Sequence, residues 1–195
     1  MSSLFLKNLQ EHQTLMSELA VLDSSVAAAI ASITDSLAQG GKVMFCGNGG
    51  SAADSQHLAA EFTGRFIRDR KPLAAIALST DSSALTCIGN DYAFSEVFSR
   101  QVDALGKAGD CLIGISTSGN SANVIKAVET ARALGIKTIG LLGRDGGQLA
   151  VLCDQSIVVA HQVTARIQEA HIVIGHTICG GVEQRLGLVP SMEED

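Results

Sequence analysis

From Gly40 onward, short apolar runs of strand length alternate with longer stretches of helical periodicity. Such alternation is typical of a parallel sheet with helical crossovers, since both faces of each strand are then buried. The predicted strands are residues 42–46, 73–78, 111–115, 137–142 and 155–159. The predicted helices are residues 51–66, 82–88, 94–105, 121–134, 148–152 and 164–186. The pattern therefore predicts an α/β fold with a doubly wound, five-stranded parallel sheet.

The start of the chain lies outside this alternation and predicts an N-terminal helical extension. Leucines recur near helical spacing from Leu4 to Leu22, and Asp23 to Ser25 could cap a second helix over residues 26–38. Such an amphipathic lead-in could cover the domain or pack against another subunit. We expect a single domain over 1–195, made of a helical lead-in (1–39), an α/β core with a long last helix (40–187) and a tail (188–195).

Composition excludes several classes of partner. A formal charge of −6, a single Tyr and no Trp leave neither a basic patch nor a stacking platform, so we expect no nucleic acid. We find no run of about 18 apolar residues and no signal-peptide pattern, so we expect no membrane partner and a cytoplasmic location. No C-x-x-C pair occurs, and we interpret all the cysteines as small core residues: Cys46, Cys87, Cys111, Cys153 and Cys179.

The segment STSGNS, residues 116–121, follows the third predicted strand and opens a helix. Unpaired amides at a helix start and the positive end of the helix dipole favour a bound phosphate. Serine and asparagine also commonly cap helices, so the plainer interpretation is a helix N-cap with spare serines. We favour the phosphate site, because four hydroxyls in six residues exceed what a cap needs.

An earlier loop, GNGGSA at residues 47–52, matches the G-x-G-x-x-A dinucleotide-binding fingerprint after a strand. That fingerprint expects an acidic residue about 20 positions further on, at the end of the second strand. Asp81 lies too far along the chain for this role, beyond the end of the second predicted strand. The loop is not a Walker loop either, because no Gly-Lys-Ser/Thr follows it. A nucleotide-binding Rossmann protein stays open as an alternative, although the second serine-rich loop weakens it.

The helix after this loop carries His57 and Glu61 at positions i and i+4, on one face. Two ligands of one metal ion can be arranged this way, and so can an ordinary hydrogen-bonded pair on a helix surface. A histidine in apolar sequence can likewise be a hydrogen-bonded core residue. The last predicted helix adds four polar residues within apolar sequence: Gln168, Glu169, His171 and His176.

Several separate segments, in order, resemble the SIS (sugar isomerase) family. They are CGNGGSAADSQHLAAEF, ALSTDSSALTCIGNDY, GISTSGNSANVIKAV, GRDGGQLA and TARIQEAHIVIGH. The sequence is most similar to the bacterial phosphoheptose isomerases of that family, over about residues 20–187. The resemblance implies a flavodoxin-like SIS fold and a phosphorylated seven-carbon sugar as the bound partner.

The resemblance also implies the site residues. It implies one Zn²⁺ per subunit, held by His57, Glu61, Gln168 and His176, with Glu61 and His176 as the catalytic pair. The substrate contacts that it implies are Asn48, Gly49, Gly50, Ser51, Glu61, Asn90, Asp91, Ser116, Thr117, Ser118, Ser121 and Gln168.

The activity implied is an aldose–ketose isomerisation of sedoheptulose 7-phosphate to D-glycero-D-manno-heptose 7-phosphate through an enediol. This reaction needs a base for a carbon-bound proton, which suits Glu61, and a group that moves protons between two oxygens, which suits His176. The family points to a homotetramer and to ADP-heptose supply for lipopolysaccharide. The alternative is a non-catalytic SIS-domain binding protein that assists the replication initiator, which we expect to lack the Glu and the final His.

Gln168 and His176 are eight residues apart on one predicted helix. Their Cα atoms should then be separated by roughly 12 Å along the axis and some 80° in direction. Either the two side chains lean together or one ligand comes from a neighbouring chain. We favour a site at a subunit interface, because the small and branched residues around His176 allow close helix packing.

Overall fold

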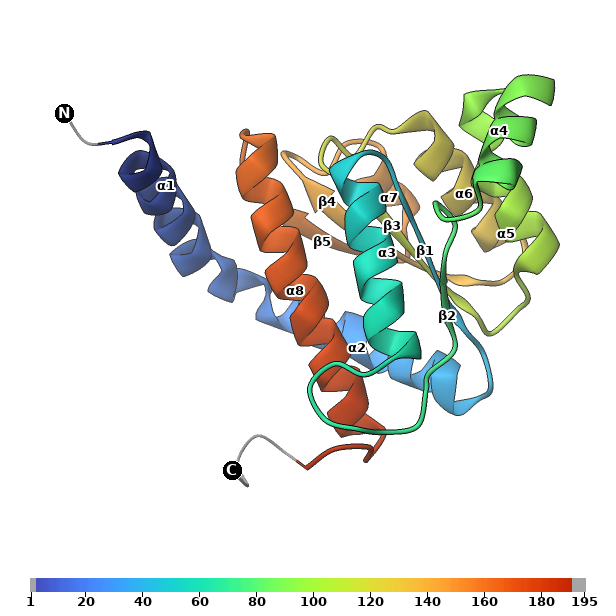
Figure 1. Cartoon of the computed structure of the whole chain (residues 1–195), viewed down its shortest axis with the longest axis horizontal. Helices are drawn as coiled ribbons and strands as arrows, with labels where there is room; N and C mark the ends of the chain where they lie inside the picture. Colours follow the sequence, from blue (N-terminus) through green and yellow to red (C-terminus); the bar gives the residue numbers. More distant parts are fainter. Residues whose placement is uncertain (1–2, 191–195) are drawn as a thin grey trace.

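The computed structural model describes residues 3–190, and it contains the five-stranded parallel sheet expected from the sequence (Figure 1). The strands are β1 (Val43–Gly47), β2 (Ala75–Ala77), β3 (Cys111–Ser116), β4 (Lys137–Gly143) and β5 (Gln155–Val159). Their order is β2-β1-β3-β4-β5, with every neighbouring pair parallel. The winding direction reverses between β1 and β3, and in open sheets of this kind ligands bind beyond the carboxyl ends of the strands at that point.

Helices cover both faces of the sheet. Those that follow the lead-in are α3 (Gly50–Thr63), α4 (Ser82–Asp91), η2 (Phe94–Glu96), α5 (Ser99–Leu105), α6 (Ala122–Ala133), α7 (Leu149–Leu152) and α8 (Thr164–Arg185). One core packs α3 and α8 on the sheet, and the other core packs α4 to α7 on the opposite face. Within β1, Phe45 enters the first core and its neighbours Met44 and Cys46 enter the second. Burial on both faces explains why this strand is a continuous apolar run.

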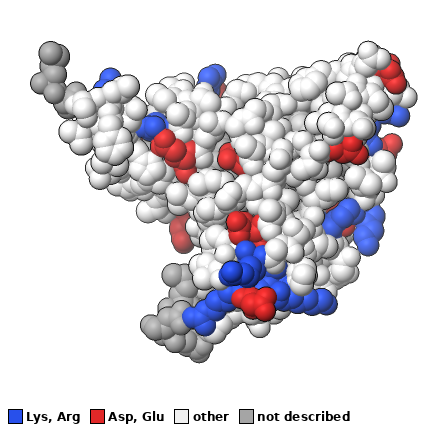
Figure 2. Space-filling model, in the orientation of Figure 1, with Lys and Arg blue, Asp and Glu red and all other residues white. Residues whose placement is uncertain are grey.

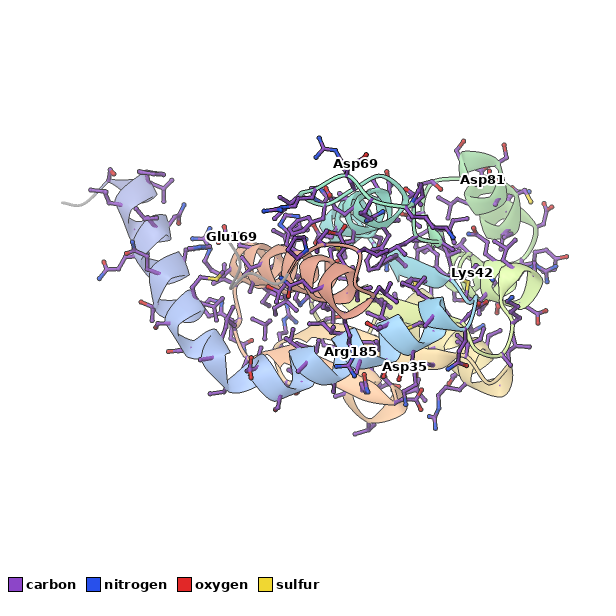
Figure 3. All side chains as sticks on the ribbon, turned by 90° about the horizontal axis from the view of Figure 1, so that it is seen from below. Asp35, Lys42, Asp69, Asp81, Glu169 and Arg185 are labelled. Atoms are coloured by element: carbon purple, nitrogen blue, oxygen red, sulfur yellow. The ribbon has the colours of Figure 1, made fainter. Side chains whose placement is uncertain are left out.

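The lead-in comprises α1 (Leu4–Glu18), a 3₁₀ turn η1 (Leu19–Leu22) and α2 (Asp23–Ala38). Figure 1 shows α1 extending away from the rest of the chain, whereas α2 lies under α8. Asp23 is the first residue of α2 and not its cap, and no side chain caps that helix. α1 is joined to α8 through Glu169, which lies 2.7 Å from the Nδ1 of His12 and also pairs with Arg166 (Figure 3).

The lead-in corrects one expectation. Its helical stretch Leu4–Ala38 contains an 18-residue window of mean hydropathy 1.4, which is apolar enough by length and composition to cross a membrane. The sequence analysis had found no such run. Only 11% of that window is buried. Ala29 and Ile33 of α2 are nevertheless completely buried in the core of the domain, so α2 packs on the domain through one face.

Three further expectations differ from the structure. The strand expected at 73–78 is only Ala75–Ala77, because β2 is an edge strand that pairs with β1 alone and exposes Ile76. The helix expected at 94–105 is divided into η2 and α5. Cys87 is exposed, while the other four cysteines are buried. Burial raises the pKa of Cys111 to about 12, as expected for an inert core thiol.

Candidate active site

The loop between β1 and α3 lies at the carboxyl edge of the sheet. Gly49, at its centre, has a positive φ of 54°, a conformation that favours glycine. The side chain of Asn48 exchanges two hydrogen bonds of 2.8 Å with that of Asn123, a buried residue in the first turn of α6. The two loops that the sequence singled out are therefore joined by a pair of amides. Sequence reasoning missed Asn123, whose signal was a polar amide just after the serine-rich loop.

The serine-rich loop turns its hydroxyls toward one another. The Oγ of Ser116 lies 2.9 Å from the Oγ of Ser121 and 3.5 Å from that of Ser118. Ser121 occupies the N-cap position of α6, yet it makes no side-chain hydrogen bond to that helix. The first-turn amides of α6 thus have no side-chain acceptor, which favours the anion site over the simple cap.

The turn after β4 packs against the serine-rich loop and hydrogen-bonds to it. Gly119 has a φ of 66°, and a Cβ built on it would lie 1.9 Å from the carbonyl oxygen of Gly146. The backbone amides of Gln148 and Leu149 donate to the Asn120 side chain and to the carbonyl of Gly119, respectively. Only glycine fits at position 119, so the loop conformation is fixed before any ligand binds.

His57, Glu61 and His176 form a cluster between α3 and α8. The Nε2 atoms of the two histidines are 2.8 Å apart, and the Nε2 of His57 is 3.3 Å from the Oε1 of Glu61. The three ligand atoms lie within 4.8 Å of one another. The His57 side chain is 47% exposed and that of Glu61 is 23% exposed, so the cluster is open to a small ligand.

The donor set of the cluster suits a zinc ion. Two imidazole nitrogens and one carboxylate oxygen are the ligands of many catalytic zinc sites, which leave a fourth position for water or substrate. The Nε2 atoms of the two histidines lie only 2.8 Å apart, so both are within reach of one ion. The residues present therefore fit the metal that the resemblance implied.

Close packing of α3 on α8 sets the spacing of this cluster. A Cβ built on Gly175, next to His176 on α8, would lie 2.6 Å from a methyl carbon of Leu58, next to His57 on α3. The absence of a side chain at position 175 lets the two helices approach closely enough for their polar residues to meet.

Gln168 of α8 lies beside the start of α3. A Cβ built on Gly50 would lie 2.1 Å from its Nε2, so its amide faces the start of that helix. Of the four predicted ligands, the structure brings His57, Glu61 and His176 together within one chain. A subunit interface is therefore not needed to join these three, and the contribution of a neighbouring subunit stays a prediction.

The remaining predicted residues fall into two groups. Ser51 is buried in the first turn of α3. Thr117 is half-buried in the serine-rich loop, and its carbonyl oxygen would lie 2.6 Å from a Cβ built on Gly143. Asn90 and Asp91 are exposed at the end of α4 and hydrogen-bond to each other, 2.8 Å apart. Within residues 3–190 neither of them is hydrogen-bonded to either loop.

Two other titratable residues, His171 and Asp54, have pKa values shifted by burial. His171 is completely buried and bonds the carbonyl of Leu142; burial lowers its pKa to about 4, and this hydrogen bond raises it. It is therefore a neutral core histidine outside the cluster, whereas His176, for which the sequence left that interpretation open, lies in the cluster. Sequence reasoning missed Asp54, whose half-buried carboxyl lies one turn before His57 and has an unpaired oxygen. Desolvation raises the pKa of Asp54, and the charge of His57 lowers it.

Comparison with known proteins places this geometry in a family. The SIS domain family model matches residues 8–143. A phosphoheptose isomerase of Rhodospirillum rubrum is 56% identical over 162 residues, which cover 83% of this chain and 86% of that protein. One from Campylobacter jejuni is 52% identical over 184 residues, 94% of this chain and 99% of that protein. The structure of phosphoheptose isomerase from Neisseria gonorrhoeae matches with a TM-score of 0.88 and 48% identity, over 92% of this chain and 97% of that one.

Proposed function

The chain belongs to the SIS-domain family, among its phosphoheptose isomerases, and from this premise we propose that it isomerises sedoheptulose 7-phosphate to D-glycero-D-manno-heptose 7-phosphate. The observation that carries the proposal is the cluster of His57, Glu61 and His176, whose ligand atoms lie within 4.8 Å of one another. Both histidine and carboxylate can take up and release protons near neutral pH, as an aldose–ketose isomerase requires.

The reaction moves the carbonyl of the sugar from C2 to C1. A base removes a proton from C1, the electrons form the enediol, and the proton returns at C2. Glu61 is suited to carry this proton, because its carboxylate lies at the open cluster and a carboxylate can act as a general base. His176 is suited to move the hydroxyl proton from O1 to O2, since an imidazole nitrogen that is not bound to a metal can accept a proton and then donate it.

We propose that His57, Glu61 and His176 hold one Zn²⁺ per subunit, with the Gln168 amide turning in as a further ligand. A bound zinc ion would supply a positive charge that polarises the carbonyl oxygen of the sugar. The residues of the chain do the rest: the two loops orient the sugar, and the close packing of α3 on α8 keeps the polar residues of the cluster together.

We propose that the phosphate of the sugar binds the serine-rich loop, where several hydroxyls gather at the start of α6 and Ser121 leaves the first-turn amides without a side-chain cap. Replacing Ser118 and Ser121 together with alanine should weaken binding of phosphorylated sugars by about 100-fold or more, because each lost charge-assisted hydrogen bond costs roughly 1.5–3 kcal/mol. The measurement is calorimetric affinity for sedoheptulose 7-phosphate and for free sedoheptulose. An equal loss for both sugars would place the phosphate elsewhere.

The activity itself can be tested directly. Sedoheptulose 7-phosphate is incubated with the protein, with and without a chelator, and conversion is followed by proton NMR. We expect the aldose signals to grow with the protein, and to grow more slowly after chelation if the metal takes part in the reaction. An intact, folded protein that gives no conversion before chelation would contradict the proposed function.

A non-catalytic binding protein is the competing proposal, and it is not favoured. We expect such a relative to lack the catalytic Glu and His, whereas Glu61 and His176 are both present here and meet at one cluster. The two proposals differ in the NMR experiment, since a binding protein would leave the ketose unchanged.

The cellular setting is also proposed. We propose a cytoplasmic homotetramer that supplies heptose for lipopolysaccharide. An assembly of subunits would cover the exposed apolar residues in the first turn of α1, where Leu4 is 74% exposed, Phe5 71% and Leu6 53%. Exposed apolar area of this kind on one helix is typical of surfaces that contact another protein.

A further inference from the structure

His176, the histidine of the proposed catalytic pair, is contacted by neighbouring rings. Imidazoles at catalytic and metal sites are commonly oriented by an acceptor at the second ring nitrogen. The Nε2 of His176 lies 2.8 Å from the Nε2 of His57. The contacts that the rest of the imidazole makes within residues 3–190 are with neighbouring rings.

An aromatic ring packs against His176. The ring of Phe66, from the loop after α3, lies 5.2 Å from the ring of His176 and is inclined to it by 40°. His176 also meets the ring of His57, at 4.9 Å and inclined by 42°. His176 therefore packs against two rings, of which only Phe66 has no other chemical role.

Phe66 contacts three residues that lie on one face of α8. Its ring contacts His176, and it lies 3.5 Å from the point where a Cβ on Gly180 would be. Its backbone amide donates to the Oε1 of Glu183 over 3.2 Å. These α8 residues follow one another at intervals of four and three, so they share one face of the helix.

The loop that carries Phe66 is anchored by a buried ion pair. The Nε of Arg70 lies 2.7 Å from the Oε1 of Glu183, and the two side chains are 2% and 3% exposed. Arg70 also donates to the carbonyl oxygens of Glu61 and Phe62 at the end of α3. In Figure 2, Lys and Arg gather at the bottom of this face, where Figure 1 shows the loop after α3 crossing the end of α8.

We infer that Phe66 is a positioning residue for His176: it sets the orientation of the imidazole by packing, and the Arg70–Glu183 pair holds it there. The inference deepens the proposed function and rests on it, because it assigns a role around the same cluster. An orientation set by packing needs an aromatic ring at position 66, and an aliphatic side chain of similar size should not replace it.

The test compares Phe66→Leu with Phe66→Tyr in the whole protein. The first readout is NMR of metal-free protein carrying ¹³C-labelled histidine, with the His176 signals assigned by a His176→Gln variant. We expect side-chain couplings for a single rotamer in wild type and in Phe66→Tyr, and averaged couplings in Phe66→Leu. This readout needs neither metal nor turnover.

The second readout is kinetic and uses sedoheptulose 7-phosphate. Phe66→Leu should lower kcat by about 10-fold or more with KM within about 3-fold, since misplacing a catalytic group by an ångström can cost about 100-fold. The affinity for Zn²⁺, measured by competition with a chromogenic chelator, should fall by roughly 10–100-fold, as for lost outer supports of metal ligands. Phe66→Tyr should restore both. Phe94→Leu, an exposed phenylalanine on η2, is the matched control and should change neither.

The outcomes separate the two proposals. A wild-type protein that does not convert the sugar, together with averaged His176 couplings in Phe66→Leu, would reject the proposed reaction and keep the positioning role. A single, unchanged His176 rotamer in a folded Phe66→Leu protein would overturn the positioning role whatever the activity. Equal losses in Phe66→Leu and Phe94→Leu would overturn it too.

Discussion

Glu61→Gln should reduce kcat with sedoheptulose 7-phosphate by about 10²- to 10⁴-fold, which is the contribution that general base catalysis typically makes. The amide keeps the shape of the side chain, but it cannot accept the proton from C1. Binding of the sugar phosphate should remain largely intact, because the proposed phosphate site lies in a separate loop after β3. Stopped assays at saturating substrate measure the first effect, and calorimetry measures the second.

Two controls make this result decisive. Bound zinc must be quantified in both proteins, because Glu61 is also a proposed metal ligand and its loss could act through the ion. Gln56→Glu places a new carboxylate on an exposed position of the same helix and should not alter the rate. More than about a tenth of the wild-type rate in Glu61→Gln would rule out this side chain as the base.

Arg70→Met should destabilise the protein by about 3–5 kcal/mol, the usual cost of leaving one partner of a buried ion pair uncompensated. The carboxylate of Glu183 is 3% exposed and would lose its cation, and the last carbonyl oxygens of α3 would lose a donor. For a chain of this size the loss corresponds to a melting temperature lower by about 10 °C. Thermal unfolding followed by circular dichroism measures it.

The matched control is Arg65→Met in the same loop. Arg65 is exposed and its guanidinium donates to the nearby carbonyl of Ile67, so the change should stay within about 0.5 kcal/mol. Adding Glu183→Leu to Arg70→Met should recover part of the loss, because the buried charge is then gone. Equal melting temperatures for Arg65→Met and Arg70→Met would refute the role of the ion pair.

The sheet and most of its helices could be predicted from the sequence, because burial on both faces makes continuous apolar runs. β1 illustrates this, since all five of its residues are buried. The edge strand β2 could not be delimited, because it pairs with one neighbour only and its burial differs from residue to residue. The break between η2 and α5 was also missed: Val97 and Phe98 lie between them and are buried, so the apolar spacing continues across the break.

The site was predictable only in part, for a related reason. His57 and Glu61 share one helix face, so their proximity follows from spacing alone. Their meeting with His176 depends on how α3 and α8 lie against each other, which no local pattern contains. The same is true of the amide pair between Asn48 and Asn123, since these residues are 75 positions apart in the chain. Family resemblance supplied some of these residues, but it supplied neither Asn123 nor Phe66.

The contact between Gly175 and Leu58 bears on how such a site can change. Positions 58 and 175 set the distance between α3 and α8. The side-chain volume at these two positions therefore determines how large a ligand fits between the polar residues of the cluster. A lineage could therefore widen or narrow this gap by exchanging bulk at positions 58 and 175 while every ligating atom stays the same. Substrate choice in descendants of this fold could then drift without any alteration in the chemical groups by which an active site is usually recognised.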